Sequence, residues 1–163
     1  MGHSIDIRRL DISDSDLASQ AIRTLKSEAE STDSLSVDSA SMKQWLENPA
    51  NILIVAAAQN AMAVGFALGY VLDRVDCPQP MLCFYELVVA PNQRRKGIGR
   101  KLVEAMKRVA DQSHARKMWV QTDPDNHAAR ALYKSAGGIE SATPDHVYSW
   151  TEGNFSEPIE VSS

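Results

Sequence analysis

Hydrophobic and polar positions follow two periods along this chain, and the two periods divide it into strands and helices. Nearly continuous apolar runs occupy residues 52–58, 64–71 and 81–89, and a shorter run occupies 118–122. Short apolar runs bounded by turn residues are typical of buried strands. An alternating segment at residues 4–10 predicts one more strand near the start of the chain.

Apolar residues at helical spacing separate these strands. The clearest pattern begins at residue 98, where apolar residues recur every three or four positions up to residue 110 and charged residues take the other face. Weaker patterns predict helices at 17–25, 42–46 and 128–136. The polar, serine-rich segment 27–41 predicts a loop, 139–150 predicts a last strand or strands, and 152–163 predicts a polar tail. We therefore expect one domain over residues 1–163, with an α+β fold and helices on both faces of a mixed sheet.

Charge is distributed unevenly, which narrows the class of ligand. Residues 94–117 contain nine Lys/Arg against two Asp/Glu, a net charge of +7, so the rest of the chain carries −11 of the total of −4. This distribution favours a basic patch for an anionic cofactor and acidic walls for a cationic substrate. The alternative is a solvated helix face that is basic. Nucleic-acid binding is not expected, because the pI is about 5.5 and no aromatic residues interleave the basic run.

Several other classes of protein are not expected. No apolar run approaches the ~20 residues of a membrane span, and the first residues lack the features of a secretion signal, so a cytoplasmic location is expected. Cys77 and Cys83 are the only cysteines. Two reduced thiols are favoured over one disulfide. No metal site is expected, because no His/Cys pair has ligand spacing.

The segment Arg94-Arg95-Lys96-Gly97-Ile98-Gly99 joins the strand at 81–89 to the helix that follows. Glycine lets the backbone curl tightly there, and it leaves no side chain between the backbone N–H groups and a ligand. Such a turn at a helix N-terminus binds anions, of which phosphate is the natural example. The Walker pattern does not fit, because it needs four residues between its glycines and a Lys-Ser/Thr pair after the second. The dinucleotide-binding pattern does not fit either, because position 102 is Leu rather than Gly.

Three motifs in this region resemble those of the GCN5-related N-acetyltransferases. The segment 94–99 resembles their R-x-x-G-x-G pyrophosphate loop, and residues 86–91 resemble their central strand. Downstream, Asn126-x-x-Ala129-x-x-x-Tyr133 with Gly137-Gly138 resembles their Asn-x-x-Ala-x-x-x-Tyr helix and its following turn. On these motifs, which span roughly residues 50–150, the chain is identified as a member of this family. The resemblance implies a mostly antiparallel sheet.

The resemblance also implies acetyl-CoA as the co-substrate and assigns residues to it. Backbone groups of the central strand would align the pantetheine arm, and one N–H would stabilise the oxyanion. Asn126 would hydrogen-bond the same arm, or cap its helix, or both. The cofactor-binding residues implied are Leu87, Val88, Val89, Arg94, Arg95, Lys96, Gly97, Ile98, Gly99, Arg100, Asn126, Ala129 and Tyr133.

Two side chains are candidates for proton transfer. Glu86 interrupts an apolar strand, where a carboxylate needs a reason, and it would serve as general base or anchor for the substrate ammonium. The alternative is a structural ion pair, with His127, His146 or water as the base. Tyr133 matches the family's general acid, and its alternative is a packing role. Alternation along the strand predicts that Phe84, Glu86 and Val88 share one face.

The acceptor is expected to be a small polycationic amine. Residues 85–89, 94–97 and 119–123 resemble the type I aminoglycoside 3-N-acetyltransferases, so the 3-amino group of an aminoglycoside is the first expectation. Carboxylates would bind its ammonium groups, and the candidates besides Glu86 are Glu28, Glu30, Asp123 and Asp145. The alternatives are a polyamine, an amino acid or a protein N-terminus as acceptor, or a non-catalytic acyl-CoA-binding module. A homodimer is compatible with the resemblance, since dimers are common in the family.

Overall fold

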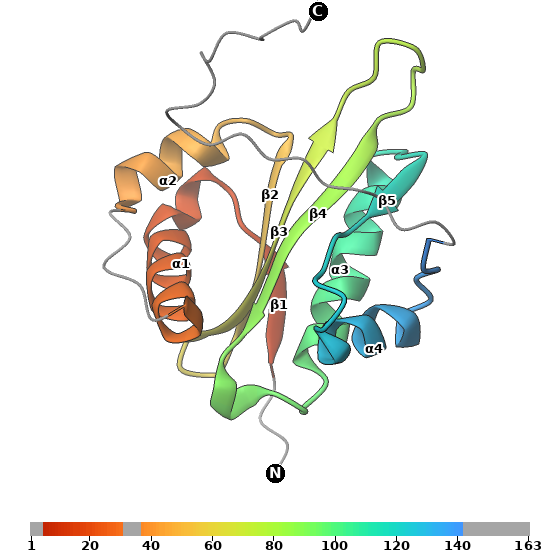
Figure 1. Ribbon diagram of the computed structural model, residues 1–163. Coiled ribbons are helices and arrows are strands. Elements are labelled where there is room, and N and C mark those ends of the chain that lie inside the picture. The colour runs from red at the N-terminus through yellow and green to blue at the C-terminus, as the bar shows by residue number, and fades with distance from the viewer. Residues whose placement is uncertain (1–4, 31–36, 142–163) are drawn as a thin grey trace, which may run out of the picture.

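A five-stranded sheet forms the centre of the structure, a computed structural model that describes residues 5–30 and 37–141 (Figure 1). The strands lie in chain order: β1 (Asp6–Arg9), β2 (Asn51–Ala57), β3 (Ala63–Leu72), β4 (Met81–Val89) and β5 (Lys117–Trp119). The strands β1 to β4 pair antiparallel with one another, and β5 runs parallel to β4. This confirms the predicted mixed, mostly antiparallel sheet.

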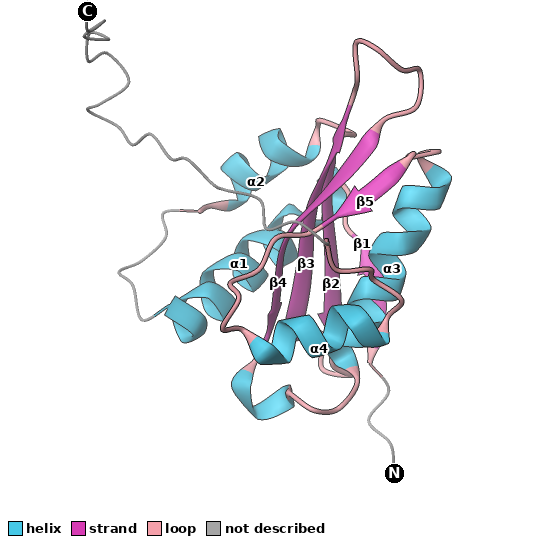
Figure 2. Ribbon diagram, turned by 45° about the vertical axis from the view of Figure 1, so that its right-hand side comes forward, coloured by secondary structure: helices cyan, strands magenta, loops and turns pink. Residues whose placement is uncertain are grey.

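Helices cover both faces of the sheet, as the sequence predicted (Figures 1 and 2). One face carries α1 (Ser15–Glu30) and α2 (Ser39–Leu46), and the other carries α3 (Ile98–Gln112) and α4 (His127–Ser135). Two short 3₁₀ helices, η1 (Ile12–Asp14) and η2 (Pro91–Gln93), precede α1 and α3. None of the helices in the described residues has the length and apolar character needed to cross a membrane.

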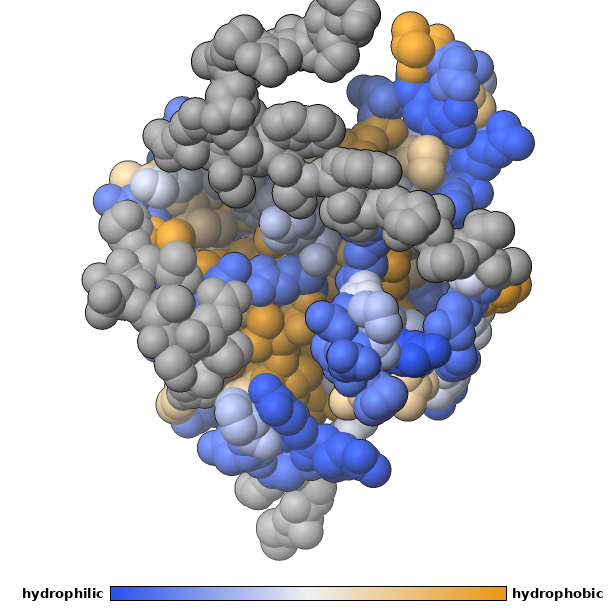
Figure 3. All heavy atoms as spheres, in the orientation of Figure 1, coloured by the Kyte–Doolittle hydropathy of each residue, from blue (hydrophilic) through white to orange (hydrophobic). Residues whose placement is uncertain are grey.

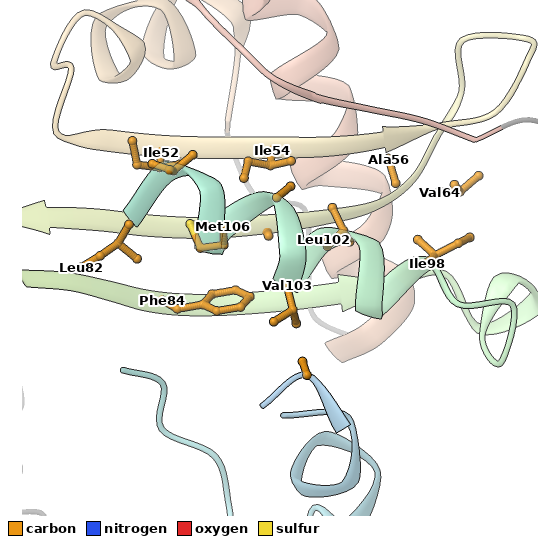
Figure 4. Close-up of a cluster of buried hydrophobic side chains, with 14 residues drawn as sticks. Ile52, Ile54, Ala56, Val64, Leu82, Phe84, Ile98, Leu102, Val103 and Met106 are labelled. Atoms are coloured by element: carbon orange, nitrogen blue, oxygen red, sulfur yellow. The ribbon is translucent and has the colours of Figure 1, made fainter. Parts of the chain in front are cut away.

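The two faces bury separate hydrophobic clusters. Leu102 and Met106 of α3 are fully buried against Phe84 and Ile54 of the sheet, in the cluster drawn in Figure 4. On the opposite face, side chains of α1 and α2 pack over Phe66 and its neighbours. Because strand residues alternate between the faces, β2 contributes to both clusters, which explains its nearly continuous apolar run.

Element boundaries differ from the sequence prediction in three places. The expected loop at 27–41 is wrong at both ends: α1 continues to Glu30, and α2 begins at Ser39 because the Asp38 carboxylate accepts the Ser41 N–H at 2.7 Å as an N-cap. The strand expected at 118–122 is only Lys117–Trp119. Residues 139–141 form no strand, and the remainder of the predicted last strand lies outside the described residues.

A β-bulge interrupts the pairing between β3 and β4. Gly69 lies opposite Phe84, but Leu68 lies opposite Glu86, so Tyr85 has no partner in the register. A bulge of this kind places an extra residue on one strand and shifts the alternation of the side chains that follow.

Because of the bulge, the side chains of β4 point to other faces of the sheet than predicted. Phe84 packs in the cluster under α3, whereas Glu86 contacts Lys26 of α1 and Val88 packs in the cluster under α1 and α2. The prediction that all three β4 residues share one face is therefore wrong for Phe84. Simple alternation would have placed Glu86 beneath α3, on the same side as the apolar cluster of Figure 4.

Candidate active site

The site is built on the edge of β4 that faces β5. The parallel pairing covers only the first part of β4, where Met81, Leu82 and Cys83 lie opposite Lys117, Met118 and Trp119. Beyond Cys83 no described strand pairs with β4 on this side. We call residues 84–89 the open β4 edge. Backbone N–H and C=O groups along an unpaired edge are available to an extended ligand.

Hydrophobic surface lies beside this edge. Leu87, Val88 and Val89 are half-buried although they belong to the central part of the sheet. Figure 3 shows hydrophobic surface, with hydrophilic residues to its right and below it, in the region where Figure 1 places β4 between α1 and α4. The open β4 edge therefore combines apolar walls with backbone groups that no described strand pairs on this side, which suits a ligand that carries amides along an alkyl chain.

At the end of β4 the chain turns through the glycine loop into α3. Arg95 and Gly97 both have positive φ, 64° and 78°, and Gly97 is the N-cap of α3. The guanidinium Nε of Arg94 donates to the Val89 carbonyl at 3.1 Å and so fastens the loop to the strand. Lys96 Nζ donates to Gln93 Oε1 at 3.0 Å in an exposed hydrogen bond.

The first turn of α3 offers unused hydrogen-bond donors. No side chain caps the helix, and within the described residues no protein acceptor takes the backbone N–H of Gly97, Ile98, Gly99 or Arg100. The first hydrogen bond of the helix runs from the Lys101 N–H to the Gly97 carbonyl, at 3.1 Å. These donors add to the positive end of the helix dipole and to three consecutive basic residues before Gly97. The loop can therefore bind a di-anionic group such as a pyrophosphate.

Gly99 allows α4 to approach the loop. A Cβ at this position would lie 3.1 Å from Leu132 Cδ2 of α4, closer than most Cβ contacts. The small residue thus fixes how near α4, which carries Tyr133, comes to the glycine loop. This packing is a second reason for glycine in the motif, separate from access to the backbone.

Tyr133 lies on α4 against the end of the apolar cluster. Its ring meets the edge of the Phe84 ring with 6.1 Å between centroids and 69° between planes. Burial raises the pKa of the Tyr133 phenol above its usual value. The phenol is therefore neutral at pH 7 and holds a proton that it can donate.

Asn126 caps the helix that carries Tyr133. Its carboxamide oxygen accepts the Ala129 N–H at 3.1 Å, which is the capping alternative stated for it above. The cap uses the oxygen and leaves the amide NH₂ for a ligand. Asn126 and Ala129 therefore set where α4 begins, and with it the position of Tyr133.

Glu86 lies on the α1 side of the sheet and forms an ion pair. Its Oε2 is 3.2 Å from Lys26 Nζ, and the two side chains are 20% and 23% exposed. An ion pair was the structural alternative for Glu86, yet a pair open to solvent to this extent can also receive a second ammonium. Within the open β4 edge, the Glu86 carboxylate thus pairs with the ammonium of Lys26.

The other predicted acceptor residues are only partly described. Asp123 is exposed after β5, and its carboxylate accepts the Asp125 N–H at 2.9 Å in a local turn. His127 is exposed at the first position of α4. Glu28 and Glu30 belong to the last turn of α1, but their side chains lie outside the described part of the structure. Asp145 and His146 also lie outside it.

Sequence reasoning missed Lys26 and a set of three aromatic rings beside Glu86. Lys26 is 60 residues from Glu86, and nothing in a local pattern links them. The rings of Trp45, Tyr70 and Tyr85 form two successive edge-to-face contacts, with centroids 6.0 and 5.7 Å apart. The only sequence signal was an aromatic residue directly before Glu86.

Both cysteines of the chain are free, as the prediction of reduced thiols stated. Cys83 is buried at the end of the β4–β5 pairing, and burial raises its thiol pKa. Cys77 lies in the loop before β4.

Comparisons with curated proteins identify two bacterial relatives. The uncharacterised N-acetyltransferase YhfO of Bacillus subtilis (strain 168) is 32% identical over 98 residues, which are 60% of this chain and 65% of YhfO. The [ribosomal protein bS18]-alanine N-acetyltransferase of Escherichia coli (strain K12) is 29% identical over 96 residues, 58% of this chain and 60% of that enzyme. The match thus spans less than two thirds of the length of either relative.

Among solved structures, the aminoglycoside acetyltransferase meta-AAC0020 from an uncultured soil metagenomic sample is similar over nearly its full length. Its complex with trehalose gives a TM-score of 0.81 at 27% identity and covers 91% of this chain and 97% of the other. Its complex with sisomicin gives a TM-score of 0.80 at 26% identity with the same coverage.

The family follows from the match of the whole central region rather than from the loop alone. The model of the acetyltransferase (GNAT) family matches residues 19–137, which include most of α1, the open β4 edge, the glycine loop and α4. With the predicted sheet also confirmed, the chain belongs to the acetyltransferase (GNAT) family.

Proposed function

We propose that this protein transfers the acetyl group of acetyl-CoA to a primary amine of an aminoglycoside. The observation that carries the proposal is the order of groups along one strand. Glu86, the later residues of the open β4 edge and the N-terminus of α3, which no side chain caps, follow one another, and Tyr133 packs on Phe84 of the same strand.

The residues of the chain suit acetyl-CoA in two places. The free N–H groups at residues 97–100 would bind the pyrophosphate, with Arg94, Arg95 and Lys96 adding positive charge. The edge backbone of Leu87, Val88 and Val89 would pair with the amides of the pantetheine arm, and the Val89 N–H would face the thioester oxygen. The family relationship supports this assignment.

The proposed reaction is a direct transfer between two bound substrates. Glu86, directly or through water, accepts a proton from the acceptor ammonium, and the neutral amine attacks the thioester carbon. The new C–N bond forms as the C–S bond breaks, and Tyr133 donates its proton to the departing thiolate. The nitrogen loses its second proton as the amide forms, and this proton returns through water to the Tyr133 phenolate, while the proton on Glu86 leaves to solvent. The net reaction therefore turns acetyl-CoA and an ammonium group into CoA, an amide and one proton.

An aminoglycoside is favoured as acceptor for two reasons. The chain outside residues 94–117 carries a net charge of −11, which attracts a polycation. In addition, meta-AAC0020, a structural relative that covers 91% of the chain, is an aminoglycoside acetyltransferase crystallised with sisomicin. The sequence resemblance to type I enzymes makes the 3-amino group the proposed position of transfer.

A protein N-terminal amine is the second candidate acceptor. It is favoured by the sequence match to the bS18-alanine N-acetyltransferase. A flexible peptide N-terminus brings one ammonium, whereas an aminoglycoside brings several, so the two candidates differ in the number of carboxylates that they need.

The test is CoA release measured with a panel of aminoglycosides, polyamines and peptides that begin with alanine. We expect the highest kcat/KM for an aminoglycoside, with a product heavier by one acetyl group and acetylated at the 3-amino group by NMR. A preference for the peptide would move the function to the second candidate. CoA binding without transfer to any amine would leave only an acyl-CoA-binding module.

A further inference from the structure

The bulge in β4 gives the molecule a feature that acetyl transfer itself does not require. Because Tyr85 is the unpaired residue, it lies on the same face as Glu86, its neighbour in sequence, instead of on the opposite face. In a regular strand, adjacent side chains point to opposite faces. The bulge therefore sets an aromatic ring and a carboxylate side by side.

The Tyr85 ring is exposed but held in place. It is 62% exposed, an unusual state for a large aromatic side chain in the middle of a sheet. One side of it meets the Tyr70 ring at 78°, and Tyr70 meets Trp45 of α2 at 79°. This series of contacts fixes the ring before any ligand arrives, so little side-chain entropy is lost on binding. We call Trp45, Tyr70 and Tyr85 the aromatic wall.

The charge beside the wall indicates which ligand it suits. Burial raises the pKa of the Tyr70 phenol, and the nearby Glu86 carboxylate acts in the same direction, so Tyr70 stays neutral beside an anion. The Lys26 ammonium already occupies a position 3.2 Å from that carboxylate. Ring faces and a carboxylate together attract ammonium groups and the C–H faces of amino sugars, and they repel anions.

We propose that the aromatic wall, with Tyr85 as its contact surface, binds a cation-bearing ring of the acceptor that does not react. This ring packs on Tyr85 while the reacting amine lies at Glu86. The inference rests on the proposed function and deepens it, because it makes Tyr85 a specificity-determining residue for acceptors with more than one ammonium group.

The experiment compares Tyr85→Leu, which keeps apolar bulk but removes the ring, with Tyr85→Phe, which keeps the ring. Met62→Leu is the matched control, because Met62 is 53% exposed in the turn between β2 and β3, away from the wall. For an aminoglycoside, Tyr85→Leu should raise KM roughly three- to thirtyfold, and Tyr85→Phe by less than about twofold. For a small acceptor with a single amine, and for acetyl-CoA, KM should stay within about twofold in all variants.

Direct binding keeps this test independent of turnover. Calorimetric titration of the parent with the aminoglycoside should show binding that Tyr85→Leu weakens by the same factor. If the parent transfers acetyl groups but Tyr85→Leu changes KM equally for both acceptors, or for neither, the wall is not an acceptor site. If the parent binds the aminoglycoside but acetylates no amine, and Tyr85→Leu weakens that binding, the proposed function fails and the wall proposal holds. A change in oligomeric state of Tyr85→Leu in sedimentation, without a change in acceptor binding, would make the wall an interface between copies and overturn the proposal.

Discussion

Replacing Gly97 isolates the electrostatic part of cofactor binding in the glycine loop. Gly97 has φ +78°, and a Cβ added there meets no atom within 4 Å, so a side chain costs backbone strain but creates no clash. Asn and Asp tolerate this conformation about equally, and each should cost about 1 kcal/mol of stability. Gly97→Asn and Gly97→Asp have the same shape, so they differ only in charge.

The expected difference in CoA affinity follows from Coulomb's law. With about 7 Å between charges and an effective dielectric constant of about 40 to 80 at this exposed turn, each phosphate charge costs about 0.6 to 1.2 kcal/mol. For a pyrophosphate of two charges, Gly97→Asp should bind CoA roughly 8- to 60-fold more weakly than Gly97→Asn. In about 1 M salt, where the Debye length is about 3 Å, most of the difference should disappear.

The assay is calorimetric titration with CoA, alongside thermal unfolding. Gly137 supplies the control pair, because it also has positive φ (88°) and open space around its Cβ but lies after α4. Gly137→Asn and Gly137→Asp should lose similar stability and bind CoA equally. Equal CoA affinity of the two Gly97 variants at low salt would show that the pyrophosphate binds elsewhere.

Four further predictions concern the proton carriers and the packing of α4. Glu86→Gln should lower kcat/KM for the amine roughly 100-fold or more and leave CoA affinity unchanged. Lys26→Met breaks the same ion pair but keeps the carboxylate. An equal loss of kcat/KM in both variants would therefore reduce Glu86 to a structural role. Tyr133→Phe should lower kcat by roughly 100-fold when chemistry limits the rate, and an unchanged kcat would leave the ring a packing role. Because burial raises the folded-state pKa of Tyr133 above its unfolded value of about 10, the free energy of unfolding should fall as pH rises beyond about 10. Urea titration should show a smaller fall in Tyr133→Phe than in the parent. An equal fall in both proteins would contradict the argument that burial raises this pKa. Gly99→Val should press on Leu132, destabilise the protein by about 1–3 kcal/mol in urea unfolding and lower kcat. Gly99→Ala should be close to neutral, because a helix gains about as much stability from Ala over Gly as the 3.1 Å contact with Leu132 costs. Unchanged stability in Gly99→Val would mean that the position of α4 does not depend on this contact.

The sequence alone was enough for the features that depend on local pattern. Apolar period and turn residues located β2, β3, β4 and α3 to within a few positions. Glycine at the junction of β4 and α3 predicted a tight turn with accessible N–H groups, and in the structure Gly97 takes a positive φ of 78° at that turn. Propensity, periodicity and backbone freedom are properties of short segments, so they can be read without knowing what packs against them.

Tertiary structure decided which groups meet around Glu86. The bulge at Tyr85 arises from the register between β3 and β4, which no single strand encodes, and it moves Glu86 to the face of α1. The contact with Lys26 and the rings of Tyr70 and Trp45 then follows from packing between elements far apart in the chain. Pairing register and helix docking are set by burial summed over the whole sheet, and for that reason the acceptor side of the site emerged only in three dimensions.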